Sequence, residues 1–308
     1  MEDLYQWGLA LIRTIQGAGN PVLTATMKGL TFLGSLYFYV LVIPLVYWCV
    51  DERKGFRLGL MMILSTALNT LLKVSFKQPR PFHLDPQVGM ITEQGYGLPS
   101  GHAQMSLTMW GIVASWGRRL FFVFAVLISF LIGFSRLYLG VHFHTDLIAG
   151  WLIGGVVLAL YALCAGPIET LLVRGGLRAQ LITTAAAALL INALLPQEAA
   201  LGSIALGMGG GYAFITRFAG FSARRGLEGM GPKRFLILAA RCLTGFTGAA
   251  LLYLGSRPLA PDHTSAFYRL FNFCRFALLQ FWISGGAPWF FLRLGLAWKR
   301  EHGGPGGV

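Results

Sequence analysis

Charged side chains are scarce in this chain of 308 residues, and acidic ones are the scarcest. Charged residues make up 12% of the sequence, and Asp and Glu together number only 12. A soluble domain carries about a quarter charged residues, so the class of soluble globular proteins is excluded. Apolar residues make up 55% of the chain, which is too many for a disordered protein. The 40 glycines follow no G-X-Y period, which excludes collagen.

Cysteine is also rare, and the sequence has no cysteine motif. The four cysteines are Cys49, Cys164, Cys242 and Cys274, each inside an apolar run. None are close enough in sequence to form a C-x-x-C pair, so a cysteine metal or redox motif is not supported. We expect all four to be buried packing residues. The acidic start of the chain predicts that no signal peptide is present.

Long apolar runs are abundant, and they predict an all-α polytopic membrane protein. A helix needs about 20 apolar residues to cross a bilayer, which gives about nine transmembrane helices here. The predicted spans are Leu30–Val50 (or from Pro21), Phe56–Phe76, Ser100–Trp116, Leu120–Leu137, His142–Ala165, Leu181–Leu195, Ala199–Phe218, Phe235–Leu254 and Phe267–Leu292. Before them, Leu4–Ile15 predicts an interfacial helix. The polar segment Lys77–Pro99 predicts a long loop.

The basic residues, which give a net charge of +13, gather on one side of the predicted spans. Nine spans put these clusters on the same face: Arg53–Arg57, Arg118–Arg119, Arg174–Arg178, Arg217–Arg234 and Arg293–Arg300. Cytoplasmic loops carry an excess of Lys and Arg, so this face is predicted to be cytoplasmic. The basic charge is thereby explained by topology, and we expect no nucleic-acid partner.

Three short polar clusters interrupt the apolar runs. One ends the second span, one opens the third, and one joins the fourth to the fifth, so all three are predicted to converge on the non-cytoplasmic face. In one-letter code they read KVSFKQPRP from Lys73 to Pro81, PSGH from Pro99 to His102, and SRLYLGVHFHTD from Ser135 to Asp146.

Three cations and a predicted helix start in these clusters are typical of a phosphate-binding site. Lys73, Arg80 and Arg136 are cations with almost no acidic neighbours, and the fork of an arginine matches phosphate oxygens. Ser100-Gly101 opens a predicted helix, where free N–H groups attract an anion.

Two histidines accompany the predicted phosphate site. His142 and Asp146 are spaced i and i+4, so the carboxylate is expected to share a helix face with the imidazole and to fix its tautomer. His102 is a second imidazole that could protonate a leaving group. The pattern indicates covalent phosphoryl transfer through phosphohistidine, although spacing alone does not say which histidine attacks.

The motifs K-x6-R-P, P-S-G-H and S-R-x5-H-x3-D, in this order, resemble the three signature motifs of the type 2 phosphatidic acid phosphatase (lipid phosphate phosphatase) superfamily. The resemblance covers about Leu30–Ala165, and Phe32-Leu-Gly with Pro44–Trp48 is similar to the sphingosine-1-phosphate phosphatase branch. It implies metal-independent hydrolysis of a lipid phosphomonoester or diphosphate, without a cofactor.

The resemblance also implies a role for each motif residue. His142 would be the nucleophile, Asp146 its orienting partner, and His102 the general acid and then the general base. The residues that would hold the phosphoryl oxygens are Lys73, Arg80, Ser100, Gly101 and Arg136. The same first step would serve a lipid phosphotransferase, and a lipid transporter or scramblase with an unused site is a second alternative.

The resulting layout has four parts: an N-terminal interfacial helix (1–27), a catalytic bundle (28–165), a transmembrane extension (166–300) and a disordered tail (301–308). The extension has no catalytic motif, which leaves open a lipid pocket, a homodimer surface or a separate role. We expect an integral protein of the cell (inner) membrane whose partners are the bilayer and a lipid phosphate, with the active site on the non-cytoplasmic side.

Several residues outside the motifs receive simpler interpretations. His144 is expected to make a structural contact, and Arg241 and Arg275 to reach the interface by snorkelling. Gly150-x-x-x-Gly154 and Gly207–Gly211 predict close helix packing. Lys77 and His83 are interpreted as plain loop residues, with contact to a headgroup as the alternative. Asp85 and Glu93 are interpreted as solvated, with repulsion of an anionic substrate at the entry to the site as the alternative.

Overall fold

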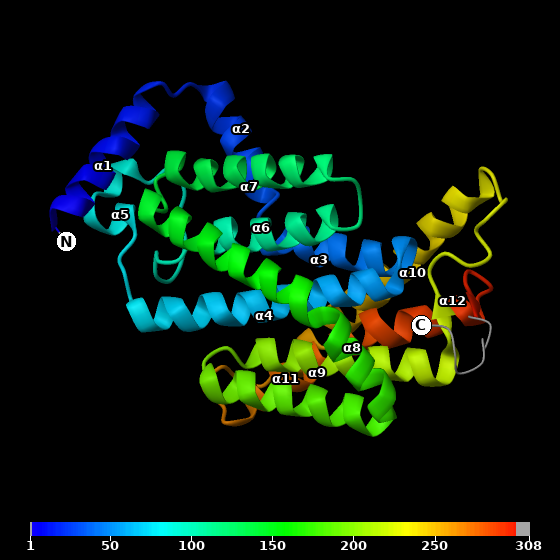
Figure 1. Ribbon diagram of the computed structural model, residues 1–308. Coiled ribbons are helices and arrows are strands. Elements are labelled where there is room, and N and C mark those ends of the chain that lie inside the picture. Colours follow the sequence, from blue (N-terminus) through cyan, green and yellow to red (C-terminus); the bar gives the residue numbers. More distant parts are fainter. Residues whose placement is uncertain (1, 300–308) are drawn as a thin grey trace. The chain divides into compact units, whose positions relative to one another are not determined.

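The computed structural model describes residues 2–299, and these are almost entirely helical (Figure 1). The chain forms two compact units, residues 2–40 with 64–166 and residues 41–63 with 167–299. Helices α3, α4 and α8 each contribute residues to both. The predicted disordered tail, 301–308, lies outside the described residues.

The first unit contains the segments that carry the three polar clusters. Its elements are α1 (Glu2–Gly17), α2 (Pro21–Phe32), the start of α3 (Leu36–Leu45), the end of α4 (Glu52–Phe76), α5 (Pro81–Leu84), the 3-10 turn η2 (Pro86–Val88), α6 (Gly101–Ala114), α7 (Leu120–Tyr138) and the first part of α8 (His144–Leu194). Helices α6 and α7 lie side by side (Figure 1).

Helix α1 has an apolar face that packs into this unit. Leu9 and Ile12 are buried against Val88, Phe143 and neighbouring apolar residues. The opposite face carries exposed side chains, so α1 is amphipathic, as its sequence predicted. This packing covers the turn between α7 and α8, where a candidate nucleophile lies.

Helices α6 and α8 approach closely because two glycines of α8 face α6. A Cβ atom at Gly150 would lie 2.6 Å from the carbonyl oxygen of Ser100, and one at Gly154 would lie 2.7 Å from that of Gln104. These distances are too short for any side chain, so the predicted packing role of this glycine pair is confirmed. The contact holds the beginnings of α6 and α8 together.

The second unit contains the end of α3, the start of α4, the rest of α8 and the C-terminal elements. These are the π-helical turn η1 (Val46–Val50), α9 (Ala199–Phe214), η3 (Ile215–Ala219), β1 (Phe221–Ser222), α10 (Lys233–Gly255), η4 (Arg257–Leu259), α11 (Phe267–Phe281), η5 (Trp282–Gly286), α12 (Ala287–Arg293) and β2 (Trp298–Lys299). The two strands pair antiparallel, Phe221 with Lys299 and Ser222 with Trp298.

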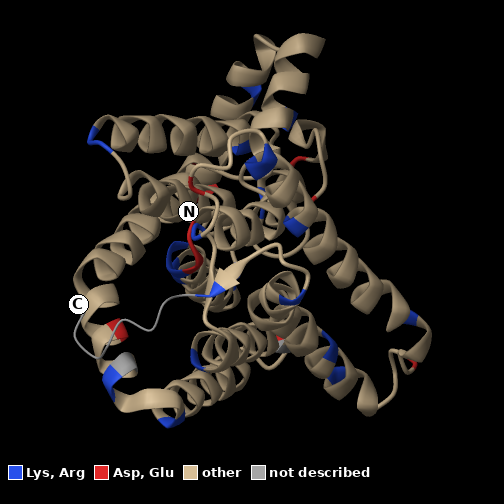
Figure 2. Cartoon of the chain, turned by 90° about the vertical axis from the view of Figure 1, so that its right-hand side faces the viewer, with Lys and Arg blue, Asp and Glu red and all other residues tan. Residues whose placement is uncertain are grey.

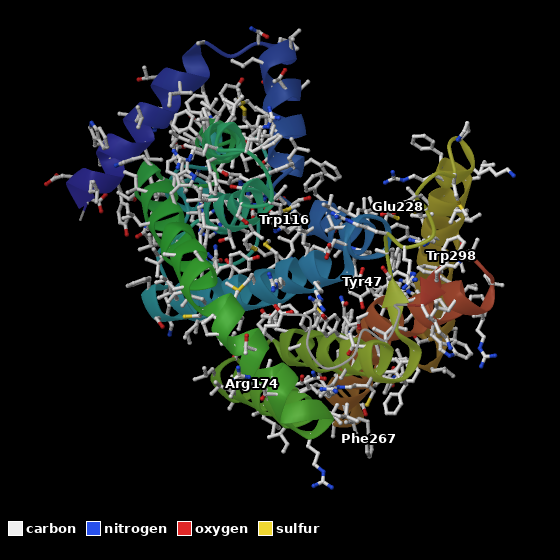
Figure 3. The ribbon with its side chains drawn as sticks, turned by 45° about the vertical axis from the view of Figure 1, so that its right-hand side comes forward. Tyr47, Trp116, Arg174, Glu228, Phe267 and Trp298 are labelled. Atoms are coloured by element: carbon white, nitrogen blue, oxygen red, sulfur yellow. The ribbon has the colours of Figure 1, made fainter. Side chains whose placement is uncertain are left out.

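Close backbone packing and a tyrosine hydrogen bond organise this unit. Helices α9 and α11 lie side by side (Figure 1), and Cβ atoms at Gly207 and Gly211 would collide with Ala277 and Ser284. The predicted packing role of this glycine run is therefore confirmed. Tyr47, labelled in Figure 3, donates its hydroxyl to the carbonyl oxygen of Ser284 at 2.6 Å.

Arg241 of α10 does not snorkel, so that expectation is wrong. Its side chain is 0% exposed, and its guanidinium donates to the carbonyl oxygens of Leu296, Trp48 and Ala223 at 2.7–2.8 Å. Trp48 lies within the π-helical turn η1, and the other two carbonyl groups lie in irregular backbone. Arg275 is half-buried, and its Nη2 donates to the carbonyl oxygen of Tyr253 at 2.7 Å.

The cysteines also depart from the expectation of burial. Cys164 and Cys274 are exposed, whereas Cys49 and Cys242 are half-buried with their sulfur atoms 3.6 Å apart. Exposure of a small apolar side chain on a helix costs little where the surrounding solvent is lipid.

Five described helices are long and apolar enough to cross a membrane, or six if the bent pair Pro21–Phe32 and Leu36–Val50 is one span. Long stretches of helix carry no charged residue (Figure 2). The predicted count of nine is not confirmed. Helix α6 has 14 residues and is about 21 Å long, whereas the hydrocarbon core is about 30 Å thick. Helix α8 contains two of the five, His144–Leu172 and Arg174–Leu194, with a kink at Gly176, where φ is 71°, and these correspond to the predicted spans His142–Ala165 and Leu181–Leu195.

Candidate active site

The first polar cluster is anchored at the end of α4 and the start of α5. Lys73 lies in the last turn of α4, and its Nζ donates to the carbonyl oxygen of Tyr96 at 2.6 Å. Arg80 precedes α5 and is 1% exposed. Its Nε donates to the carbonyl oxygen of Gly95 at 2.8 Å, and its Nη2 to that of Gln94 at 3.0 Å. The loop before α6 thus wraps around both cations.

The second cluster opens α6, as its sequence predicted. Ser100 is the N-cap, and its hydroxyl accepts from the backbone N–H of Ala103. The backbone N–H of Ser100 donates to the carbonyl oxygen of Asp146 at 2.9 Å, which ties this cluster to the third. The ring of His102 packs next to Gly34, where a Cβ would lie 3.0 Å from Cδ2 of the imidazole.

The third cluster turns the chain between α7 and α8. Gly140 has φ of 70°, a left-handed conformation that favours glycine and ends α7. Helix α8 then begins at His144, so His142 lies just before the helix and not within it as predicted. The helix begins there because Oδ2 of Asp146 accepts from the backbone N–H of Phe143 at 2.9 Å, as an N-terminal cap.

His142 is held on both ring nitrogens. Its Nδ1 lies 3.1 Å from Oδ2 of Asp146, and its Nε2 lies 3.2 Å from Nη1 of Arg80. Arginine can only donate and an ionised carboxylate can only accept. The proton is therefore on Nδ1, and Nε2 has a lone pair directed at the guanidinium. Oδ1 of Asp146 accepts from Nε2 of Gln78 at 2.8 Å, so three donors fix the carboxylate.

The electrostatic surroundings keep His142 neutral. Burial, followed by the positive charges of Arg80, Lys73 and Arg136 and by His102, holds the pKa of His142 well below its ordinary value. Each of these groups acts on the imidazole only because it is close to it. A neutral imidazole is the form that can act as a nucleophile.

Arg136, in the last turn of α7, has an incompletely used guanidinium. Its Nη1 donates to the hydroxyl of Thr31 at 2.9 Å, and its Nη2 contacts the carboxylate of Glu93. Within residues 2–299, no hydrogen-bond partner of its buried Nε is found. A buried donor of this kind is rare unless a ligand or water completes it.

A buried polar network supports α6 and was not identified from the sequence. Nδ2 of Asn69 donates to Oε1 of Gln104 at 2.8 Å and to the carbonyl oxygen of Pro99. Nε2 of Gln104 donates to both oxygens of Ser65 at 2.9 and 3.0 Å. The sequence did offer a sign of this network, since Asn69 and Gln104 lie inside predicted spans. Unpaired polar groups are costly in lipid, so such amides are expected to pair with each other. Gln78 was missed too, although it lies within the first motif.

The remaining polar residues of the region have structural contacts. The ring of His144 packs edge-on against Trp7 with centroids 4.3 Å apart, so its predicted structural contact is confirmed. Nδ1 of His83 accepts from the backbone N–H of Arg80. Glu93 differs from the expectation of a solvated loop residue, because it contacts Arg136.

All eight sequence-predicted site residues therefore belong to the first unit, and the hydrogen bonds link all three clusters. A basic nitrogen lone pair, buried guanidinium groups and a helix N-terminus are thereby brought close together. Such a set can bind a phosphoryl group and attack its phosphorus atom.

Comparison with known proteins agrees with this chemistry. The model of the PAP2 superfamily matches residues 54–168, and that of the PAP2 superfamily phosphatase, transmembrane extension, matches residues 199–299. Lipid phosphate phosphatase delta of Arabidopsis thaliana is 30% identical over 50% of this chain and 41% of its own length. Phosphatidylglycerophosphatase B of Bacillus subtilis (strain 168) is 29% identical over 44% and 71%, and sphingosine-1-phosphate phosphatase 2 of Mus musculus is 31% identical over 42% and 38%.

The chain thus spans about two-fifths of the length of the Arabidopsis and mouse relatives. The two family models cover the catalytic motifs and the extension in turn, and together they match most of the sequence. The resemblance inferred from the three motifs is confirmed, and the chain belongs to the PAP2 superfamily.

Proposed function

We propose that this chain is an integral-membrane lipid phosphatase that hydrolyses a lipid phosphomonoester or diphosphate through a phosphohistidine at His142. The observation that carries the proposal is the state of His142, whose Nδ1 faces Asp146 while its Nε2 lone pair faces Arg80. The names of the relatives, which are phosphatases of phosphorylated lipids, support a lipid phosphate as substrate.

In the first step, the Nε2 lone pair of His142 forms a bond to phosphorus and the bond from phosphorus to the lipid oxygen breaks. His102 gives a proton to that oxygen, and the lipid leaves as an alcohol or a monophosphate. Asp146 stabilises the positive charge that develops on the imidazole. Lys73, Arg80, Arg136 and the N–H groups at Ser100-Gly101 hold the phosphoryl oxygens.

In the second step, His102 takes a proton from water, and the water oxygen attacks phosphorus. The phosphorus–nitrogen bond breaks, which returns neutral His142 and releases inorganic phosphate. Metal independence is part of the proposal, because three protein cations already serve the phosphoryl oxygens. Between residues 2 and 299, no three or more His, Cys, Asp or Glu side chains are arranged to hold a metal ion.

We also propose that the site faces away from the cytoplasm of the cell (inner) membrane. Support comes from the basic clusters Arg53–Arg57, Arg118–Arg119 and Arg174–Arg178. This topology keeps nine crossings, in which short and interrupted helices also cross. Residues 28–165 form the catalytic bundle and 166–300 the extension, where a lipid pocket and a homodimer surface are the alternatives.

The test is release of inorganic phosphate from a panel of detergent-solubilised lipid phosphates by the purified protein. His142→Ala should lower turnover by about 10²-fold or more, and wild-type protein should accumulate acid-labile, histidine-bound phosphate. His144→Ala is the matched control, because that imidazole packs against Trp7 and should leave turnover intact. No release from any member of the panel would contradict the proposal, and labelled phosphate appearing in lipid would indicate a phosphotransferase.

A further inference from the structure

The carboxylate of Glu93 lies beside the guanidinium groups that are proposed to bind the substrate phosphate. Glu93, in the loop before α6, contacts Nη2 of Arg136 and lies 3.8 Å from Nη2 of Arg80. The two arginine side chains are 2% and 1% exposed, whereas that of Glu93 is 30% exposed. Two buried cations thus share one anion that lies on their solvent side.

The donors beside Glu93 are the ones that a phosphate would need. The Nε and Nη1 groups of Arg80 are used by the carbonyl oxygens of Gly95 and Val141 and by His142. Its Nη2 donates one hydrogen to the carbonyl oxygen of Gln94, and the second N–H of this nitrogen is the one left for Glu93, 3.8 Å away. Nη1 of Arg136 is likewise used by Thr31. A bound phosphoryl group and the Glu93 carboxylate would therefore compete for the same N–H groups.

We propose that Glu93 is a specificity-determining residue that is displaced by the substrate phosphate and then disfavours diphosphates relative to monophosphates. This inference rests on the proposed phosphatase function. After displacement, the carboxylate stays tethered within a side chain's length of the bound phosphoryl group. The second phosphate of a diphosphate brings further negative charge close to it, whereas the neutral oxygen-linked chain of a monophosphate does not. Like charges at this distance repel, most strongly where water is partly excluded.

Glu93→Gln tests the proposal, since glutamine keeps the shape and one acceptor oxygen for Arg136 but removes the charge. Asp85→Asn is the matched control, because that carboxylate is in the same loop region but pairs with Arg13 at 2.6 Å. The first readout is the affinity for inorganic phosphate, measured by calorimetry without turnover. Glu93→Gln should bind phosphate about tenfold more tightly than the wild type, and Asp85→Asn should match the wild type.

The second readout is the ratio of kcat/KM for farnesyl diphosphate to that for farnesyl monophosphate. This ratio should rise about tenfold in Glu93→Gln and stay constant in Asp85→Asn. Glu93→Asp, whose side chain is one methylene shorter, should move both readouts in the same direction by a smaller amount. It replaces the glutamine variant in the test if that variant does not fold.

Unchanged or weaker phosphate binding, or an unchanged ratio, in a folded Glu93 variant would overturn the inference and leave the phosphatase function standing. Wild-type protein that hydrolyses neither prenyl substrate nor any other lipid phosphate would overturn the proposed function. In that case the phosphate affinities would still decide whether Glu93 competes for the arginines.

Discussion

Replacement of Asp146 by Asn tests how the candidate nucleophile is held, because it removes a charge without changing the size of the side chain. Oδ2 accepts from Nδ1 of His142 at 3.1 Å and from the backbone N–H of Phe143 at 2.9 Å. Oδ1 accepts from Nε2 of Gln78 at 2.8 Å. All three partners act as donors, and an asparagine offers only one acceptor oxygen.

The asparagine can keep its oxygen toward His142 and Phe143 if its NH2 group faces Gln78, whose own amide can turn to present an oxygen. The Nδ1–H tautomer then survives, but the anion that stabilises the developing imidazolium is lost. A hydrogen bond to a charged group contributes about 1.5–3 kcal/mol, and about 1.4 kcal/mol corresponds to a factor of ten in rate. We expect Asp146→Asn to slow phosphorylation of His142 roughly 10- to 150-fold.

Gln78→Leu completes a double-mutant cycle. This substitution alone removes one of the three donors to the Asp146 carboxylate. The rate of phosphorylation should then fall only about threefold, which corresponds to the loss of one net hydrogen bond at the weak end of the range measured for hydrogen bonds in proteins. In the double variant, the asparagine amide has two possible orientations. In one, its NH2 group faces the leucine and has no acceptor; in the other, its NH2 group faces the backbone N–H of Phe143, which is also a donor. The double variant should be at least about tenfold slower than the product of the single effects.

The assay is rapid-quench measurement of acid-labile protein phosphate under single-turnover conditions, with a labelled lipid phosphate. Circular dichroism and thermal midpoints would establish that each variant is folded. A rate for Asp146→Asn within twofold of the wild type, or single effects that simply multiply, would refute this account of the carboxylate.

Three further results follow from the site. The thermal midpoint should fall between pH 7 and pH 5.5 by more in the wild type than in His142→Gln. His142 of the unfolded chain takes up a proton near pH 6.5, whereas buried His142 of the folded chain, with its lowered pKa, does not. The free energy of unfolding then falls by at most about 1.4 kcal/mol per pH unit. Equal slopes would contradict this. Phosphate release should persist in EDTA and be inhibited by vanadate, and a strict requirement for added Mg²⁺ or Zn²⁺ would contradict the proposed chemistry. In a background without the native cysteines, an impermeant thiol reagent should label exposed Gln87→Cys in intact cells and exposed Arg118→Cys only after permeabilisation, whereas the reverse pattern would invert the topology.

The three clusters of the candidate site could be placed on their helices from the sequence because each cluster is local. Lys73 at the end of a helix and Ser100 at the start of another follow from apolar runs that stop or begin at those residues. The position of His142 was predicted less well. An i, i+4 spacing indicated a shared helix, but Asp146 caps the helix and leaves His142 in the preceding turn. Both arrangements satisfy the same spacing, and they differ in the cap at Phe143 and in the left-handed backbone of Gly140.

The membrane spans could not be counted reliably from hydropathy, for a related reason. Mean apolarity over a window does not register a break in the backbone, and several runs contain one. The run Leu30–Val50 includes the bend after Phe32, and the run from Phe267 includes the π-helical turn Trp282–Gly286. By contrast, the two runs predicted within α8 are found as two separate helices that could cross a membrane, His144–Leu172 and Arg174–Leu194, with a kink at Gly176.

Two buried arginines show why residue type alone does not identify a phosphate-binding cation. Arg80 and Arg241 are both at most 1% exposed, and each donates to three backbone carbonyl oxygens. Carbonyl groups let a charged guanidinium remain buried without a carboxylate of its own. The difference lies in what the remaining donors face. The free side of Arg80 faces the partly exposed Glu93, which an incoming anion can displace, whereas Arg241 is closed in by its own unit and stabilises irregular backbone. A guanidinium can serve an anionic substrate only if it keeps a donor that the substrate can reach, and that property depends on tertiary packing.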